Sequence, residues 1–170
     1  MLQVLFDTNI YGKIVADEQR EAVIKAILKS HLRVLNFRLV RDELRQTSKQ
    51  KIVAHKRKLR AFLLRAYDEI ATASPTPVSR NINQLADLYF SEYKRLGGNV
   101  GKTRILSDLK IMACATLHRC DLVFSDDHHV MRGSPAISAC RIVNAIGNLR
   151  SPRFHSYGEL KHMINVSYCR

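Results

Sequence analysis

The sequence predicts an α/β fold with a mainly parallel sheet. Short apolar runs alternate along the chain with longer segments of helical periodicity, which is the pattern of such folds. Hydrophobic residues make up 46% of the 170 residues, enough for a full core, and this composition argues against disorder. The length suits one domain, so we expect a single domain over residues 1–170.

Four short segments are expected to form strands. An apolar run from Leu2 to Phe6 stops at Asp7, as a buried strand would. Further strands are expected from Val34 to Phe37, from Leu122 to Phe124 and from Arg141 to Ile146. In a parallel sheet of this kind, ligands bind beyond the carboxyl ends of the strands.

Longer segments with apolar residues at helical spacing are expected to form the helices. Pro75 and Pro77 break the chain between two of them, and Gly97 and Gly98 close another. The expected helices run from Glu18 to Leu32, Leu39 to Thr47, Ile52 to Ile70, Ile82 to Leu96, Ile105 to His118 and Tyr157 to Asn165.

The chain is strongly basic. It carries 28 Lys and Arg against 15 Asp and Glu, a net charge of +13. Such a surface attracts polyanions, RNA or DNA first and an anionic membrane second, although a merely basic soluble protein has the same composition. No apolar run approaches the roughly 18 residues of a membrane span, and the N-terminus lacks the features of a signal peptide. We therefore expect a cytoplasmic location and no membrane partner.

Two basic segments are candidates for binding RNA phosphates. The stretch from Lys49 to Arg65 has seven basic and no acidic residues, and we expect a basic helical segment at about 49–65. Its basic face can meet RNA, an acidic partner or only solvent. The second segment follows Gly101. The candidate RNA-binding residues are Lys49, Lys51, Lys56, Arg57, Lys58, Arg60, Lys102 and Arg104.

Acidic residues are few in this chain, yet several follow the ends of predicted strands. Asp7 comes directly after the first strand, and Asp126 and Asp127 follow a later one. Asp108 is expected in the first turn of the helix that precedes that later strand, and Glu43 on the short helix after the second strand. Because the carboxyl ends of parallel strands open on one edge of the sheet, these carboxylates are expected to converge in one cleft.

A cluster of four carboxylates implies a cation. Two unit charges about 4 Å apart repel by roughly 4 kcal/mol at an effective dielectric constant near 20. Oxygen-only ligands suit Mg²⁺ or Mn²⁺, which can activate water for attack on a phosphodiester. The four cysteines form no C-x-x-C pair and are expected to be buried apolar residues. Each acid alone also has an ordinary explanation, as an N-cap, a helix-dipole partner, a solvated side chain or a turn residue.

Five short motifs follow one another along the chain: VLFDTN at 4–9, DEL at 42–44, SDLKIMACA at 107–115, LVFSDD at 122–127 and YGEL at 157–160. As an ordered set they resemble the PIN-domain nucleases, of the kind found in VapC-type toxins. The resemblance covers nearly the whole chain, although no single motif is specific.

This resemblance implies a three-layer α/β/α sandwich that acts as a metal-dependent endoribonuclease on single-stranded or structured RNA, with Mg²⁺ or Mn²⁺ as cofactor. It implies that Asn9 is an amide supporting the metal ligands and that Ser125 is a hydroxyl beside the site. Glu43 would bind the ion directly or through water. The acids that match the catalytic set of the family are Asp7, Glu43, Asp108 and Asp127.

The sequence departs from the family pattern in two places. Asp126 adds an acid beside Asp127, so that either can face the metal. The stretch from Lys49 to Arg65 is longer and more basic than in the compact toxins. The resemblance also implies an acidic antitoxin protein as a partner, and a homodimer.

Two other functions compete with the nuclease hypothesis. A catalytically silent RNA-binding module of the same fold would keep the basic surface and fail to position the metal. A receiver-like phosphoacceptor domain would also bind Mg²⁺ through an acid doublet, but there the doublet comes early in the chain and here it comes late. RNA cleavage assays with and without EDTA distinguish the silent RNA-binding module from a nuclease. Labelling with acetyl phosphate distinguishes a phosphoacceptor domain from a nuclease.

Overall fold

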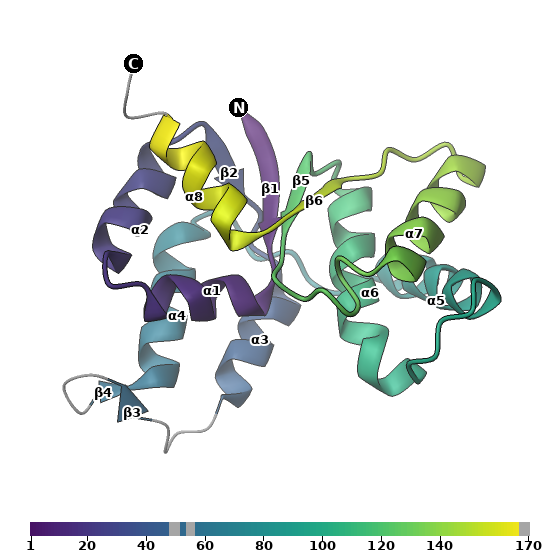
Figure 1. The fold of residues 1–170 in the computed structure, drawn as a ribbon, viewed down its shortest axis with the longest axis horizontal. Coiled ribbons are helices and arrows are strands. Elements are labelled where there is room, and N and C mark those ends of the chain that lie inside the picture. Colours follow the sequence, from purple (N-terminus) through teal and green to yellow (C-terminus); the bar gives the residue numbers. More distant parts are fainter. Residues whose placement is uncertain (48–51, 54–56, 167–170) are drawn as a thin grey trace.

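A parallel sheet runs through the middle of the molecule, between two groups of helices (Figure 1). The structure, a computed structural model, describes residues 1–47, 52–53 and 57–166. Within these residues four strands form the central sheet, in the order β2-β1-β5-β6, and every neighbouring pair is parallel. The strands are β1 (Leu2–Phe6), β2 (Leu32–Val34), β5 (Leu122–Phe124) and β6 (Arg153–His155). The predicted α/β fold with a mainly parallel sheet is confirmed.

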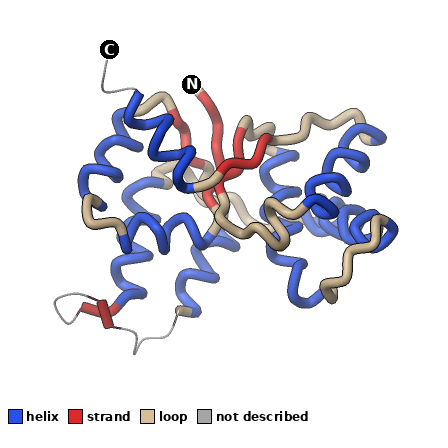
Figure 2. Tube along the Cα trace, viewed as in Figure 1, coloured by secondary structure: helices blue, strands red, loops and turns tan. Residues whose placement is uncertain are grey.

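Helices cover both faces of this sheet, which gives the three layers that the resemblance implied (Figure 2). Helices α1, α2, α4 and α8 lie on one side, α5, α6 and α7 lie on the other, and α3 packs against α4. Their bounds are α1 Thr8–Ala16, α2 Arg20–Lys29, α3 Arg38–Gln46, α4 Leu59–Ile70, α5 Arg80–Arg95, α6 Lys102–Leu117, α7 Ser134–Ile146 and α8 Tyr157–Val166. No helix in the described part of the chain combines the length and hydrophobicity that crossing a bilayer requires.

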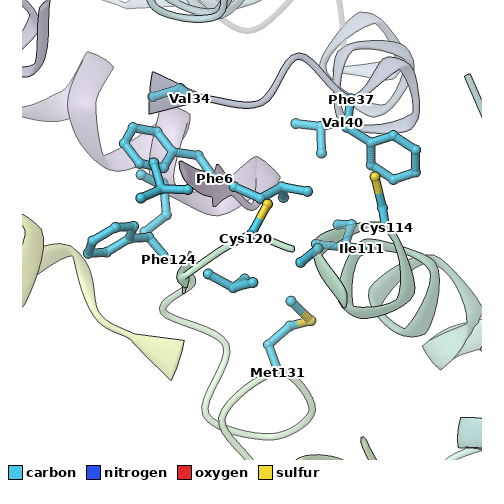
Figure 3. Packing of buried hydrophobic residues seen from close by; sticks show 14 of the residues in the cluster. Phe6, Val34, Phe37, Val40, Ile111, Cys114, Cys120, Phe124 and Met131 are labelled. Carbon is cyan, nitrogen blue, oxygen red and sulfur yellow. The ribbon is translucent and has the colours of Figure 1, made fainter. Parts of the chain in front are cut away.

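The two central strands are apolar along their length because helices cover both of their faces. Phe6 and Phe124, at neighbouring strand ends, meet edge to face with ring centroids 5.4 Å apart. Figure 3 shows side chains of α6 reaching the same cluster from the other layer. The free thiols of Cys114, Cys120 and Cys140 are buried, as expected for apolar residues, and Cys169 lies outside the described residues.

The predicted fourth strand is wrong. Residues 141–146 form the second half of α7, which begins at Ser134 and has a proline in its first turn, where a missing amide hydrogen costs nothing. Ile142 and Val143 therefore continue a helix that started earlier in the chain. The fourth strand is β6, a segment of three residues that is too short and too polar to give a recognisable strand pattern.

The helix predicted from Ile52 to Ile70 is correct only in its second part. Residues Ile52–Val53 and Arg57–Lys58 form a small antiparallel pair, β3 and β4, and α4 begins at Leu59. β-branched residues at 52 and 53 favour strand over helix. The basic segment at about 49–65 is thus not one helix. The candidate RNA contacts Lys49, Lys51 and Lys56 lie outside the described residues, as do the side chains of Arg57 and Lys58.

Two differences near the strand ends matter for the site. Helix α1 starts directly after Asp7, and the sequence did not predict it. Helix α6 starts at Lys102, three residues before the predicted start, so Asp108 lies in its second turn. The helix-dipole explanation for Asp108 is therefore wrong, because that effect is confined to the first turn. Strand β2 ends at Val34, where the sequence predicted a strand to begin.

Candidate active site

The acidic residues gather where β1 and β5 end side by side. In the order β2-β1-β5-β6 the chain leaves β1 for β2 on one side and reaches β5 on the other. Ligands of open α/β sheets bind at such a reversal of strand order. The backbone N–H of Asp7 donates to the carbonyl of Phe124 over 2.9 Å, which ties the two strand ends together. Asp7 and Asp127 are consequently close although 120 positions separate them in the sequence.

Asp7 is the most buried acid of this group, with 4% of its surface exposed. Its carboxylate accepts hydrogen bonds from the backbone N–H of Thr8 over 2.6 Å, from Asn9 Nδ2 over 2.5 Å and from Ser125 Oγ over 2.7 Å. The bond from Thr8 also makes Asp7 the N-cap of α1. The explanation of Asp7 as an N-cap is therefore confirmed, and it does not exclude a place for the same carboxylate in a metal site.

Asn9 and Ser125 form a frame that joins Asp7 to the turn after β5. Asn9 Oδ1 accepts from the backbone N–H of Asp126 over 2.9 Å, and Asn9 Nδ2 also donates to Ser125 Oγ over 3.1 Å. Ser125 is fully buried, and its Oγ accepts from the backbone N–H of Asp127 over 3.0 Å. Both side chains thus fix the position of the turn relative to Asp7 through direct hydrogen bonds.

Glu43 and Asp108 come from two different helices, α3 and α6. Thr8 Oγ1 donates a hydrogen bond to Glu43 Oε2, which turns this half-buried carboxylate from α3 toward the start of α1. Helices α3 and α6 pack against each other, and α6 presents Asp108 to the same place. Glu43 is therefore not the solvated side chain that its position between two arginines allowed.

Two of the four acids hold their protons far more tightly than usual. Burial first, and the carboxylates of Asp7, Asp127 and Glu43 second, together raise the pKa of Asp108 to about 8. Burial also raises the pKa of Asp7 to about 6. There the hydrogen bonds from Ser125 and Thr8 oppose the increase, while Glu43 and Asp127 add to it. The four acids therefore interact electrostatically as one group.

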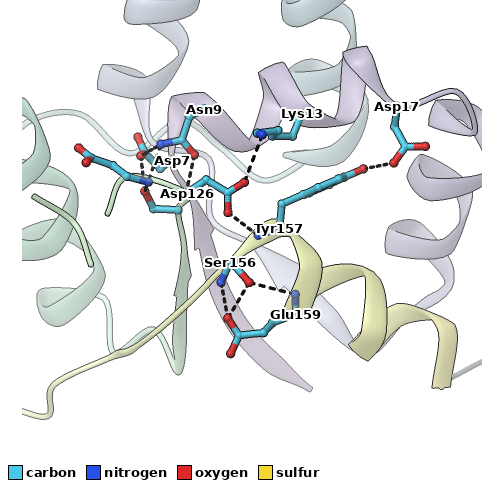
Figure 4. Close-up of polar contacts among 10 residues, drawn as sticks. Asp7, Asn9, Lys13, Asp17, Asp126, Ser156, Tyr157 and Glu159 are labelled. Carbon is cyan, nitrogen blue, oxygen red and sulfur yellow. Dashed lines mark hydrogen bonds and ion pairs between the residues drawn. The ribbon is translucent and has the colours of Figure 1, made fainter. Parts of the chain in front are cut away.

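The two neighbouring aspartates after β5 point in different directions. Asp127 belongs to the group of four and uses Oδ1 to accept from the backbone N–H of His129 and Val130, over 2.8 and 3.1 Å. Asp126 instead accepts from the backbone N–H of Tyr157 over 2.9 Å, and its second oxygen lies 3.8 Å from Lys13 Nζ (Figure 4). The structure brings Asp7, Glu43, Asp108 and Asp127 together and turns Asp126 toward α8.

The four carboxylates fit a hard divalent cation. They offer only oxygen donors, and the pKa values of Asp7 and Asp108 are raised by burial and, to a smaller extent, by the other acids of the group. Within the described residues no three Asp, Glu, His or Cys side chains stand close enough to hold one ion among themselves. Mg²⁺ does not need such a cage, because it commonly takes one or two carboxylates and completes its shell with water and substrate phosphate.

The candidate phosphate-binding residues differ in their surroundings. Lys102 pairs with Asp87 over 2.9 Å, and Arg60 donates to the carbonyl of Arg45. Arg104 is exposed and lies one turn before Asp108, so the two share a face of α6. The sequence did not single out Lys13, which lies one turn after Asn9 on α1. Only a prediction of α1 itself could have placed Lys13 at the site.

The fold has a counterpart among solved structures. A chain of the crystal structure of VapBC2 from Rickettsia felis, bound to a DNA fragment from their promoter, aligns with a TM-score of 0.55. The alignment covers 91% of this chain and 98% of that chain, with 11% sequence identity. This likeness supports the VapC-like fold that the motifs implied. The sequence matches no known family and no curated protein.

The raised pKa of Asp108 makes the stability of the metal-free protein pH-dependent. The destabilisation is full above a folded pKa of about 8 and decreases as the pH falls toward the ordinary value of 3.8. In EDTA at pH 9, we expect the free energy of unfolding of Asp108→Asn to exceed that of the wild type by at least about 1 kcal/mol. At pH 5 the difference between the two free energies should be smaller. Melting temperatures across this range measure the effect, with Glu69→Gln on α4 as an exposed control. An Asp108→Asn protein that is less stable than the wild type at pH 9 would contradict the repulsion.

Ser125→Ala tests the frame. The substitution removes the buried hydroxyl that donates to Asp7 and accepts from the Asp127 amide, so we expect a loss of about 1 to 3 kcal/mol in the free energy of unfolding. Urea denaturation measures it. Ser91→Ala, which removes an exposed hydroxyl from α5, should change stability by less than about 0.5 kcal/mol. Equal stabilities of the two variants would show that Ser125 does not hold the turn.

Proposed function

We propose that this protein is a metal-dependent endoribonuclease that hydrolyses RNA phosphodiester bonds. Asp7, Asp108 and Asp127 would bind Mg²⁺ or Mn²⁺, with one or two of these carboxylates contacting an ion directly and the others reaching it through water, and Glu43 would bind it directly or through water. The observation that carries the proposal is the convergence of these four carboxylates at the reversal of strand order, with the pKa of two of them raised toward neutrality. A bound divalent cation would lower the pKa of a water molecule and stabilise charge on the phosphodiester.

The protein residues prepare the site for that ion. Asn9 and Ser125 donate to the same carboxylate oxygen of Asp7, which fixes that oxygen in place. The hydroxyl of Thr8 likewise donates a hydrogen bond to the carboxylate of Glu43 and orients it. Asp108, which carries a proton at neutral pH when no cation is present, would lose it to solvent on metal binding. Metal binding should therefore release protons near pH 7.

The charge of the chain supports a polyanionic substrate. A net charge of +13 sits on a protein whose acidic residues are in part committed to this site. Arg104 lies beside Asp108 on α6, where it can contact a phosphate next to the scissile bond. We extend the same role to Lys102 and Arg60. The remaining candidate phosphate contacts are Lys49, Lys51, Lys56, Arg57 and Lys58.

The same proposal includes two protein partners. An acidic antitoxin would suit the basic surface, and a second copy of the chain would form a homodimer, as the resemblance to VapC-type toxins implies. The neighbour with the same fold is a VapBC2 complex, which supports the first of these. We place the protein in the cytoplasm, where the buried free thiols of Cys114, Cys120 and Cys140 would stay reduced. Small-angle scattering and co-expression with the adjacent reading frame address both partners.

Loss of a proposed metal ligand should separate cleavage from binding. We expect Asp7→Asn and Asp108→Asn each to abolish Mg²⁺-dependent cleavage of a fluorescent RNA, while the affinity for that RNA in EDTA stays within about threefold of wild type, because binding rests on the basic surface. Asp68→Asn on α4, which removes an exposed carboxylate that pairs with Arg41, is the matched control. Near wild-type cleavage by either site variant would exclude the site. Tight RNA binding with no cleavage by the wild type would favour the silent RNA-binding module.

Arg104 provides a second test, on substrate binding. Arg104→Glu should weaken RNA binding and lower the slope of log affinity against log salt concentration by roughly 0.7 to 0.9, the value of one phosphate contact. Arg80→Glu changes the same charge at the opposite end of the α5–α6 pair and serves as the control. Electrophoretic mobility shifts at several salt concentrations measure both slopes. Equal slopes for the two variants would remove Arg104 from the binding surface.

A further inference from the structure

Asp126 stands next to a proposed metal ligand, yet both oxygens of its carboxylate contact groups on α1 and α8 that do not belong to the metal-site acids. Its Oδ1 accepts from the backbone N–H of Tyr157, at the start of α8. Its Oδ2 faces Lys13 Nζ on α1 at 3.8 Å. Its own backbone N–H donates to Asn9 Oδ1. Figure 4 shows these contacts side by side, with Asp126 between α1 and α8.

Tyr157 continues this chain of contacts to the far end of α1. Its hydroxyl donates to Asp17 Oδ2 over 2.8 Å, and Lys161 Nζ lies 2.9 Å from the same oxygen. Asp17 is the C-cap of α1, whose first turn carries Asn9. The turn after β5 therefore contacts the start of α8 through Asp126, and α8 contacts the end of α1 through Tyr157. The first turn of α1 contacts the turn after β5 again through Asn9.

The start of α8 is built to receive a negative charge from this turn. The N–H groups of a first helical turn have no partners within the helix, and they attract anions. Ser156 Oγ accepts from the backbone N–H of Glu159, and Glu159 accepts from the backbone N–H of Ser156, so a capping box occupies part of this end. The N–H of Tyr157 is left for Asp126, which supplies its acceptor.

We propose that Asp126 is a positioning residue, whose carboxylate fastens the turn carrying Asp127 to the N-terminus of α8 and does not bind the metal. This inference rests on the proposed function. The helix terminus and Lys13 offset the charge of Asp126, so the residue adds little repulsion to the four acids beside it.

Two substitutions at the same position distinguish a positioning residue from a ligand. Asp126→Asn keeps an oxygen that can accept from the Tyr157 amide and loses only the charge, whereas Asp126→Ala loses both. We expect the Mg²⁺ dissociation constant of Asp126→Asn to stay within about threefold of wild type, because exposed ion pairs such as that with Lys13 contribute little. For Asp126→Ala we expect a dissociation constant raised at least about tenfold, as when a group supporting a metal ligand is removed.

The measurements are melting temperatures over a Mg²⁺ titration, together with amide hydrogen exchange in EDTA, which needs no metal. In EDTA, the amides of residues 127–130 should exchange faster in Asp126→Ala than in wild type and Asp126→Asn. Asp127→Asn is the comparison for a proposed ligand and Asp68→Ala the control for an exposed acid. If Asp126→Asn loses as much Mg²⁺ affinity as Asp127→Asn, Asp126 is a ligand and the inference fails. Wild-type exchange rates in Asp126→Ala would also overturn it.

Failure of the proposed function gives a different result. A wild-type protein whose melting temperature does not respond to Mg²⁺ has no metal site, whatever the variants do. The hydrogen-exchange comparison still decides in that case whether the Asp126 carboxylate fastens the turn, because it depends on the contact of that carboxylate with the Tyr157 amide and not on a metal.

Discussion

The interaction on which the site depends is repulsion among buried carboxylates, held in check by a few hydrogen bonds. Asp7 and Asp108 are taken out of water and set near two other acids, which is unfavourable for their charged forms. The fold meets this cost at Asp7 with three donors and leaves Asp108 to be neutralised by a proton. A protein gains nothing in stability from such an arrangement, and strained or destabilised groups of this kind are typical of functional sites.

The architecture explains why these groups meet. Strands β1 and β5 are neighbours in the sheet and end together, so the residues that follow them share one edge. Helices α3 and α6 pack against each other, and each contributes one acid. The apolar side chains of both strands are enclosed between the two helical layers, which makes the strand ends a rigid support (Figure 3). Asn9 and Ser125 then set the turn after β5 relative to Asp7 by direct contact.

Much of this could be predicted from the sequence, and the limits have physical causes. β1 and β5 were predictable because strands buried on both faces are apolar throughout, whereas β6 is a short edge strand with a polar pattern. The gathering of Asp7, Glu43 and Asp108 with the acids after β5 was expected from the strand ends, and the resemblance to PIN-domain nucleases selected Asp127. The direction of Asp126 did not, because it depends on where α8 packs, and neighbouring residues in a turn carry no signal of which side chain faces which partner. Helix α1 was hidden because nine residues that include a glycine and a β-branched threonine give a weak helical pattern.

The most direct test of this account is the pKa of the Asp108 carboxyl group, measured by ¹³C NMR with and without Mg²⁺. Without metal, the carbon resonance of Asp108 should titrate near pH 8, because burial and three neighbouring acids favour the protonated form. With saturating Mg²⁺ the midpoint should fall by several units, since a bound cation reverses the electrostatic balance. A midpoint near the ordinary 3.8 in metal-free protein, unchanged by Mg²⁺, would contradict the claim that these carboxylates form one cation-binding group.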